Sequence, residues 1–195
     1  SVASRGLGDV YKRQTIILPR IMEVGKNACE RLPAIMESLG VSKPLIVTDK
    51  MMVQLGYVKR IQTVLDAQQF TTEVFDDTIP EPTDTSIMGG VNILKNGDFD
   101  CLIALGGGSP IDSAKAIGIL GKFGGVIGDY KFPRIVNEEN LPIIAIPTTA
   151  GTGSEATKFT IITDEANNEK LLCVGIAFMP IATIIDYSLT LSVPP

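Results

Sequence analysis

Short apolar runs alternate along this chain with longer segments in which apolar residues recur at helical spacing. The apolar runs predict strands at 15–18, 45–49, 72–75, 101–105, 142–146 and 182–185. Helical spacing predicts helices at 25–39, 51–69 (with a break near Gly56), 83–95 and 110–120. Two further runs, 159–163 and 171–174, bracket a polar turn and predict a β-hairpin. Strands that alternate with helices indicate an α/β domain with a parallel sheet and helices on both faces.

The run at 101–105 leads into a glycine turn and then a helix, an arrangement suited to binding a phosphate. Three glycines at 106–108 let the backbone turn sharply and approach a ligand closely. Ser109 suits the helix N-cap, and Asp112 completes a pattern like a capping box. The free N–H groups and the positive dipole end of the helix would face the turn. The spacing is neither the G-x-G-x-x-G of the common Rossmann motif nor a Walker loop, and a turn capped by Asp112 also occurs without a ligand.

Asp49 ends another predicted strand and is a candidate for binding a ribose. A carboxylate there accepts hydrogen bonds from both ribose hydroxyls and repels a 2′-phosphate. The alternative is that Asp49 only caps the helix that follows it. The acidic residue precedes the glycine turn here, whereas it follows the turn in the usual Rossmann order, so the topology differs even if the chemistry is similar.

Three threonines and a lysine extend the candidate site. Thr148, Thr149 and Thr152 offer hydroxyls in a loop after the fifth predicted strand, and Thr152 also suits a capping box with Glu155. Lys170, at the far side of the hairpin turn, either reaches a ribose or phosphate oxygen or is a solvated turn lysine. Because the carboxyl ends of parallel strands share one edge of a sheet, we expect the threonine loop, the glycine turn and the acidic strand end to converge.

Composition narrows the class of protein. With 195 residues, of which 45% are hydrophobic and 20% charged, the chain can bury the core of one domain. A formal net charge of −5 argues against a nucleic-acid-binding surface, and no apolar run is long enough to span a bilayer. Cys29, Cys101 and Cys173 lack metal-ligand spacing, and Cys101 and Cys173 lie in apolar runs, where we expect buried thiols in a reducing cytoplasm. Histidine is absent, which removes Ser-His-Asp catalysis and histidine metal sites from these residues.

Residues 1–14 read differently from the rest, because they are polar, basic and glycine-bearing and show no periodicity. They do not fit a secretory signal, since no apolar segment follows the basic residues. We expect a non-native or disordered leader at 1–14 and a folded domain at 15–195.

Three segments together resemble one protein family. They are Gly106-Gly-Gly-Ser-Pro-Ile-Asp112, Pro147-Thr-Thr-Ala-Gly-Thr-Gly-Ser-Glu155, and Ile184-Ile-Asp-Tyr-Ser-Leu-Thr190 with Pro194-Pro195. The second segment is highly specific, and Val47-Thr-Asp-Lys50 and Pro80-Glu-Pro-Thr83 also match. From about residue 15 to residue 195, the chain resembles the iron-containing (group III) alcohol dehydrogenase family, which includes lactaldehyde reductase and propanediol dehydrogenase.

The resemblance implies a Rossmann-like NAD-binding α/β domain at 15–195. In the full-length protein it implies a second, helical domain that binds Fe²⁺ or Zn²⁺ through one aspartate and three histidines. The first two ligands of the family lie in a D-x-x-x-H pattern shortly after the Pro-Pro. Because the chain ends at Pro195, we expect a truncated protein whose metal ligands lie beyond residue 195. Asp186 belongs to an earlier motif and is not expected to be a ligand.

The resemblance also implies roles for individual residues. Asp49 would contact the adenosine ribose and favour NAD over NADP, and Gly107, Gly108 and Ser109 would hold the pyrophosphate. The threonines would line the path to the nicotinamide, and Lys170 would reach the nicotinamide ribose. The full expected set of cofactor-binding residues, none of them catalytic, is Asp49, Gly107, Gly108, Ser109, Asp112, Thr148, Thr149, Thr152 and Lys170.

We therefore expect an oxidoreductase, an NAD-dependent alcohol dehydrogenase or aldehyde reductase that transfers a hydride between NAD(H) and a small alcohol or aldehyde. The expected partners are that substrate and a second copy of the chain, in a homodimer or higher homo-oligomer, with no nucleic acid and no membrane. Two alternatives stay open. Either this chain by itself forms a nucleotide-binding module without turnover, or the parent is a glycerol-dehydrogenase-like relative with the same two-domain fold.

Overall fold

The computed structural model describes residues 16–191. The predicted leader at 1–14, Thr15 of the first predicted strand, and Pro194-Pro195 of the third family segment lie outside the described residues.

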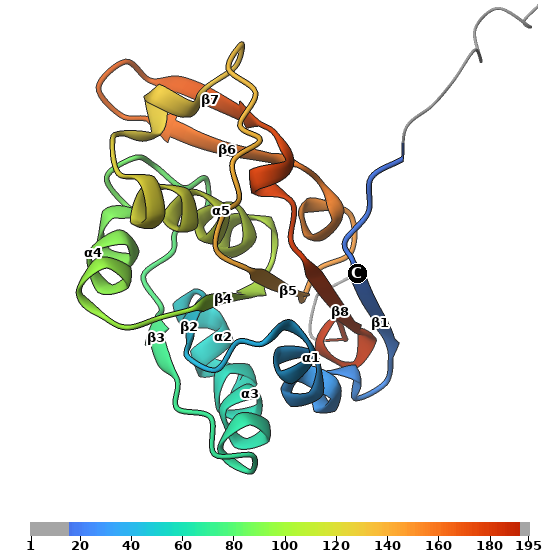
Figure 1. Cartoon of the computed structure of the whole chain (residues 1–195). Helices are drawn as coiled ribbons and strands as arrows, with labels where there is room; N and C mark the ends of the chain where they lie inside the picture. The colour runs from blue at the N-terminus through green and yellow to red at the C-terminus, as the bar shows by residue number, and fades with distance from the viewer. Residues whose placement is uncertain (1–15, 192–195) are drawn as a thin grey trace, which may run out of the picture.

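A six-stranded parallel sheet forms the centre of the fold (Figure 1). Across the sheet the strand order is β1-β8-β5-β4-β2-β3, and every neighbouring pair is parallel. The strands are β1 (Ile21–Gly25), β2 (Pro44–Val47), β3 (Glu73–Phe75), β4 (Cys101–Gly106), β5 (Ile143–Pro147) and β8 (Ala182–Asp186). The predicted fold class, a parallel α/β sheet, is confirmed.

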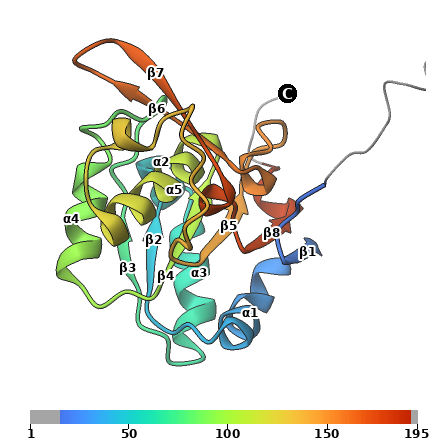
Figure 2. The ribbon, with the colours of Figure 1, turned by 45° about the horizontal axis from the view of Figure 1, so that its top comes forward.

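Helices cover both faces of the sheet, and a separate antiparallel hairpin lies outside the helices of one face (Figures 1 and 2). One face carries α1 (Leu32–Leu39), α2 (Lys50–Gln54) and α3 (Tyr57–Asp66), and the other carries α4 (Met88–Asn96) and α5 (Gly108–Phe123). The predicted hairpin is confirmed as β6 (Phe159–Asp164) and β7 (Glu169–Val174), which packs on α5. Short 3₁₀ segments are η2 (Ala28–Arg31), η3 (Ile127–Tyr130), η4 (Ser154–Ala156), η5 (Ile176–Phe178) and η6 (Tyr187–Leu189).

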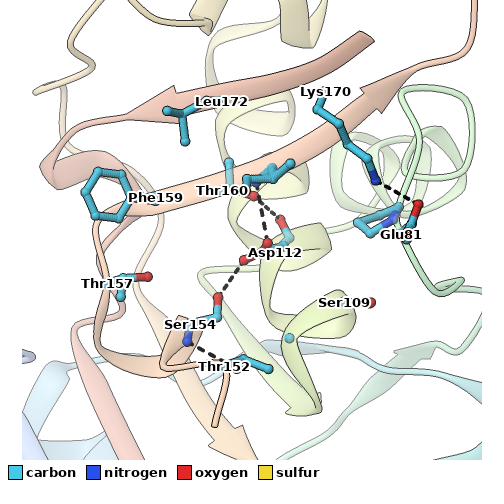
Figure 3. A pocket seen from close by; sticks show the side chains of 13 residues that line it. Glu81, Ser109, Asp112, Thr152, Ser154, Thr157, Phe159, Thr160, Lys170 and Leu172 are labelled. Atoms are coloured by element: carbon cyan, nitrogen blue, oxygen red, sulfur yellow. Dashed lines mark hydrogen bonds and ion pairs between the residues drawn. The ribbon is translucent and has the colours of Figure 1, made fainter. Parts of the chain in front are cut away.

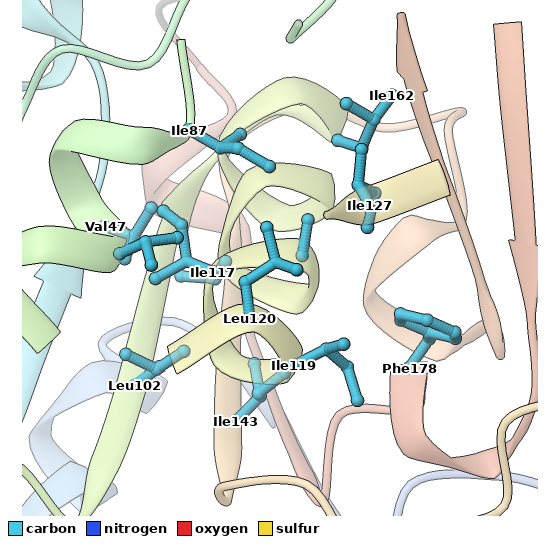
Figure 4. Packing of buried hydrophobic residues seen from close by; sticks show 14 of the residues in the cluster. Val47, Ile87, Leu102, Ile117, Ile119, Leu120, Ile127, Ile143, Ile162 and Phe178 are labelled. Atoms are coloured by element: carbon cyan, nitrogen blue, oxygen red, sulfur yellow. The ribbon is translucent and has the colours of Figure 1, made fainter. Parts of the chain in front are cut away.

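Strand β4 is buried along its whole length, and its side chains pack alternately into two separate hydrophobic cores. Leu102 and Ala104 point into the core beneath α4 and α5, part of which Figure 4 shows. Ile103 and Leu105 point into the core beneath α1 and α3. Because alternate residues of a strand face opposite sides of its sheet, a strand covered on both faces must be apolar throughout. That requirement explains the continuous apolar run in the sequence.

The strand order creates a crevice at the carboxyl edge of the sheet. From β2 the chain moves outward to β3, and it then returns to place β4 on the other side of β2. The loops that follow β2 and β4 therefore leave in opposite directions, toward helices on opposite faces. A crevice at such a switch in strand order is the usual ligand site of an open parallel sheet. In this chain it lies between Asp49, after β2, and the glycine turn after β4.

Two predicted boundaries at the start of the fold are wrong. Residues 16–18 form no regular element, and the first strand is β1 instead, which the apolar runs did not indicate. Met22 and Val24 on β1 are exposed because β1 is an edge strand with β8 as its only sheet neighbour. The predicted helix at 25–39 begins as η2 and becomes α-helical at Leu32, one residue before Pro33, which suits the first turn of a helix.

The remaining predicted elements hold with shifted ends. The break near Gly56 separates α2 from α3, and the helix predicted at 83–95 begins later, at Met88. Its first residues form a turn instead, in which Ser86 and Thr83 exchange hydrogen bonds of 2.8 to 3.0 Å. Hydroxyls that bond to nearby backbone compete with a helix in this way.

The three cysteines are buried and free, as predicted for Cys101 and Cys173. Burial raises the pKa of the Cys29 thiol to about 12, with a further contribution from Asp186, so this thiol is unreactive at neutral pH. Among residues 16–191, no helix combines the length and apolarity needed to cross a membrane.

Replacing Ile103 with alanine should destabilise the chain by about 2–5 kcal/mol, because the side chain is fully buried beneath the helices and its loss leaves a cavity. Val126→Ala is the matched control, since Val126 is 65% exposed, and it should change stability by less than about 0.5 kcal/mol. Urea unfolding of the variants and the wild type measures both effects. Equal destabilisation by the two substitutions would contradict this account of the core.

Candidate functional site

Two adjoining cavities open at the carboxyl edge of the sheet and share Gly108 and Ser109. We call the first the Asp49 cavity, about 520 Å³, and the second the hairpin cavity, about 610 Å³. The Asp49 cavity is lined by residues 49–52, 76–80, 107–110, Thr148 and Thr149. The hairpin cavity is lined by Glu81, Pro82, Gly108, Ser109, Asp112, Thr152, Ser154, Thr157, residues 159–161, Lys170 and Leu172. The nine residues predicted from sequence all line one cavity or both.

Asp49 performs the structural role that the sequence left open and still faces the cavity. Its Oδ1 accepts a hydrogen bond of 3.0 Å from the Met52 N–H, which makes Asp49 the N-cap of α2. Its Oδ2 lies beside the glycine turn, 3.6 Å from where a Cβ on Gly106 would stand. One carboxylate oxygen thus caps the helix while the other lies toward the turn, so the two roles are compatible.

The helix that follows the glycine turn begins earlier than predicted and has a different N-cap. Helix α5 begins at Gly108 with Gly107 as its N-cap, and no side chain caps it. The predicted Ser109 cap and Asp112 capping box are therefore wrong. The backbone turns at Gly106, one residue before the N-cap, and the φ of +144° at Gly106 is accessible in practice only to glycine. The start of α5 consequently has no side-chain cap, and its first residues, Gly108 and Ser109, line both cavities.

The turn and the threonine loop pack closely against each other. A Cβ on Gly108 would stand 3.1 Å from Thr152 Cγ2, and one on Gly107 would stand 3.3 Å from Thr149 Oγ1. The Thr148 N–H donates to the Gly106 carbonyl at 3.0 Å, which ties the end of β5 to the turn. Any side chain larger than hydrogen at the two glycines would therefore narrow the space between the cavities.

Thr149 carries an unsatisfied polar atom in the Asp49 cavity. Its Oγ1 is buried and has no hydrogen-bond partner in the structure. A buried hydroxyl without a partner is costly, and a bound ligand can supply the missing hydrogen bond. Thr152, by contrast, is exposed, and its Oγ1 accepts from the Ser154 N–H at 3.3 Å. The capping box considered for Thr152 and Glu155 does not form, since η4 begins after Gly153 without a side-chain cap.

Asp112 lies at the floor of the hairpin cavity (Figure 3). Its Oδ1 accepts a hydrogen bond of 2.5 Å from the Ser154 hydroxyl, and its Oδ2 accepts a long one, 3.4 Å, from the Ile161 N–H. Burial raises the pKa of the Asp112 carboxyl, and the nearby Lys115 charge and the Ser154 hydrogen bond partly offset that effect. Asp112 thus offers an acceptor to a ligand instead of capping its own helix.

Lys170 and Glu81 form an ion pair at the rim of the hairpin cavity, with Nζ and Oε2 2.7 Å apart (Figure 3). Both side chains are more than half exposed, so the pair contributes little to stability. The backbone around it is fixed, because the Thr163 N–H donates to the Pro82 carbonyl and the Asp84 N–H donates to the Thr163 carbonyl, each at 2.8 Å. The Lys170 side chain thus lines the cavity rim beside Glu81.

Lys115 is the functional candidate that the sequence reading missed. It is fully buried in the middle of α5, and burial lowers its pKa to about 8. The signal was present, because residues 113–120 of the helix are all buried and Lys115 is the one charged residue among them. A helix buried all round has no solvated face for a lysine, so a charge there needs partners inside the protein.

Among the residues described, the candidate site offers no cluster of metal-binding side chains. Within residues 16–191 there is no group of three or more histidine, cysteine, aspartate and glutamate side chains placed to hold a metal ion. The residues described here therefore do not fit a divalent metal centre.

Three comparisons with known proteins agree with one another. The sequence model of iron-containing alcohol dehydrogenase matches residues 19–187. The NAD-dependent methanol dehydrogenase of Bacillus methanolicus is 33% identical over 91% of the chain and 46% of its own length. The lactaldehyde reductase of Escherichia coli K12 is 37% identical over 92% of the chain and 48% of its own length. The crystal structure of sulfoacetaldehyde reductase from Bifidobacterium kashiwanohense in complex with NAD⁺ superimposes with a TM-score of 0.86 at 31% identity, covering 94% of the chain and 48% of that structure. The chain spans about half the length of the relatives that it matches.

The cap made by Asp49 predicts a stability effect that is separate from any ligand. Asp49→Ala should lower the free energy of unfolding by about 1 kcal/mol, because α2 loses its N-cap. Asp49→Asn retains an acceptor for the Met52 N–H and should stay within about 0.5 kcal/mol of the wild type. Chemical denaturation of the two variants without ligand measures the difference. If both variants are equally destabilised, the carboxylate charge and not the cap is what stabilises the helix.

Proposed function

The chain belongs to the iron-containing alcohol dehydrogenase family, and from this premise we propose that residues 15–195 are the NAD-binding part of an alcohol dehydrogenase or aldehyde reductase. The observation that carries the proposal is the convergence of an uncapped helix start, a glycine turn and the Asp49 carboxylate on two adjoining cavities. A dinucleotide has two nucleoside halves joined by a pyrophosphate. Two cavities that share a helix N-terminus are complementary to that shape and charge.

The residues present fit such a ligand. Gly107 and Gly108 leave a space against the threonine loop that a Cβ would fill, and the N–H groups of α5 have no competing side-chain cap. The orphaned Thr149 Oγ1 gains a hydrogen-bond partner when a polar ligand enters. Helix α5 has 16 residues, long enough for a full positive dipole end at the pyrophosphate position.

We assign the expected residues as follows. Asp49 accepts from the hydroxyls of the adenosine ribose, and Gly107, Gly108 and Ser109 hold the pyrophosphate by their N–H groups. Asp112 accepts from a donor on the nicotinamide half, in the hairpin cavity. The hydroxyls of Thr148, Thr149 and Thr152 line the path between the halves, and Lys170 contacts the nicotinamide ribose.

Bound NAD supplies the hydride carrier of the reaction. This chain's own residues fix the orientation of the dinucleotide, and none of them is assigned as an acid, base or nucleophile. By themselves they are thus proposed to bind NAD(H) without turning over a substrate. We propose that the small alcohol or aldehyde and an Fe²⁺ or Zn²⁺ ion are held by residues beyond 195, and the greater length of the relatives supports this division.

Two further features are proposed for the whole protein. The exposed Met22 and Val24 on the edge strand β1 support a homodimer or higher homo-oligomer, since exposed apolar side chains on a sheet edge favour pairing. Three free, buried cysteines support a reducing compartment, which we take to be the cytoplasm.

Asp49→Asn tests the ribose assignment. The preference for NADH over NADPH, measured as the ratio of their dissociation constants, should fall by about tenfold, or 1.4 kcal/mol, because the negative charge that repels a 2′-phosphate is lost. Asparagine keeps the helix cap, so the fold is held constant. Asp66→Asn, at the end of α3, makes the same change in net charge outside the cavities and should leave the ratio unaltered. An unchanged ratio in Asp49→Asn would refute the assignment.

Gly108→Val tests the phosphate assignment. The new side chain occupies the space between α5 and the threonine loop, so NADH affinity should fall by at least about a hundredfold while the circular dichroism spectrum stays native. Gly128→Val is the control, because a Cβ there meets no atom within 4 Å. Calorimetric titration with NADH measures binding by both variants. A folded Gly108→Val chain with wild-type affinity would rule out the glycine turn as the phosphate site.

A further inference from the structure

Lys115 is a buried cation whose hydrogen bonds all lead to the walls of the hairpin cavity. Its side chain is fully buried, and its Nζ donates to the Phe159 carbonyl at 2.7 Å and to Ser154 Oγ at 2.9 Å. Thr157 completes the set, with its carbonyl at 3.2 Å and its hydroxyl at 3.4 Å. An ammonium has three protons, and these three residues use all of them. The bonds join the middle of α5 to the chain that runs from η4 into β6.

The Ser154 hydroxyl links this cation to Asp112. Because Ser154 Oγ accepts a hydrogen bond from the Lys115 ammonium, its own O–H is free to donate to Asp112 Oδ1, 2.5 Å away (Figure 3). Lys115 Nζ is itself 3.8 Å from the same oxygen. The direction of the hydrogen bonds is therefore fixed from lysine to serine to carboxylate. Asp112 Oδ1 is occupied, and Oδ2, which has only the long bond to the Ile161 N–H, retains acceptor capacity.

The charges around Lys115 come from two elements. Asp112 on α5 and Glu155 on η4 are the anionic groups that act on the ammonium. Asp112 is 21% exposed, which gives its carboxylate access to the cavity, whereas Lys115 has none. A single carboxylate would suffice to pair with a buried lysine. Here the ammonium instead donates its hydrogen bonds to Ser154, Thr157 and Phe159, so its arrangement holds the cavity wall as well as balancing charge.

We propose that Lys115 is the positioning residue of the hairpin cavity: its buried ammonium orients the Asp112 carboxylate through Ser154 and fixes the start of β6 against α5. This inference rests on the proposed function, since it concerns the nicotinamide half of the proposed NAD site. It adds to the site a residue, Lys115, that touches no ligand and acts through Ser154 and Asp112.

The arrangement makes NADH binding dependent on pH. Neutral lysine has two protons, so one of the three bonds is lost when the ammonium deprotonates. Burial lowers the pKa of Lys115 to about 8 against the attraction of Asp112 and Glu155, so this loss falls within the working range of a titration. NADH affinity should be highest at about pH 7 and should decline as pH rises through 8, since the orienting form of Lys115 is the protonated one.

The test is NADH binding by the chain, measured by fluorescence at pH 7.0 and pH 9.5 in wild type, Lys115→Met, Ser154→Ala and Lys122→Met. Wild-type affinity should fall severalfold between the two pH values. Ser154→Ala keeps the buried charge and removes the link, so it should bind about tenfold more weakly at pH 7.0 and lose most of the pH dependence. Lys115→Met should bind more weakly still. Lys122, exposed near the end of the same helix, is the control and should behave as wild type.

The outcomes separate the inference from the proposed function. A wild-type chain that binds no NADH at either pH overturns the proposed function and the inference with it. If the wild type binds NADH with equal affinity at both pH values, or if Ser154→Ala matches it throughout, the proposed function stands and the positioning role is wrong. If Lys115→Met does not fold, Ser154→Ala decides the question alone.

Discussion

The position of the amino end of α5 is the constraint on which the rest of this structure depends. The helix is held from below by β4 and β5 and from above by the β6–β7 hairpin, and residues 113–120 are buried all round. No side chain caps the N–H groups of its first turn. A rigid helix with an open, positively polarised end at the carboxyl edge of a parallel sheet is a site prepared for an anion. The other candidate residues are arranged around that end.

The two cavities follow from how the flanking segments are tied to this helix. On one side Asp49 caps α2 and borders the glycine turn, so the position of the carboxylate is set by the helix that it caps. On the other side the hairpin is joined to α5 through the Lys115 ammonium and the Asp112 carboxylate. Hydrogen bonds therefore fix each wall, and the binding surface is preformed. Because the walls are preformed, the protein loses less conformational entropy when a ligand binds.

Much of this could be predicted from the sequence, because local rules and global fold agree. A wholly apolar run such as β4 is expected to be buried on both faces, and glycines directly after it are expected to form a turn. The strand, the turn and the helix were therefore predicted in their correct order. That order brings Asp49, the turn and the threonine loop to one edge, as the lining of the cavities bears out. Family resemblance added the identity of the proposed ligand, which no periodicity contains.

What the sequence did not predict depends on contacts between distant residues. Nothing local indicates that Asp112 bonds to Ser154, 42 positions away, in preference to its own helix end. Lys115 likewise finds its partners far along the chain, at Ser154 in a predicted loop and at Phe159 at the start of the predicted hairpin. The edge strand β1 was missed because an exposed strand lacks the apolar signature of a central one.

The most direct test of the central claim is an NMR titration of the ¹⁵N-labelled chain with NADH. The account predicts saturable amide shifts concentrated at residues 106–112 and 148–154 and at Asp49, which together surround the amino end of α5. Absence of saturable shifts would contradict it. So would shifts centred instead on the cavity at the opposite edge of the sheet, lined by Ser42, Lys43 and Glu73 among others.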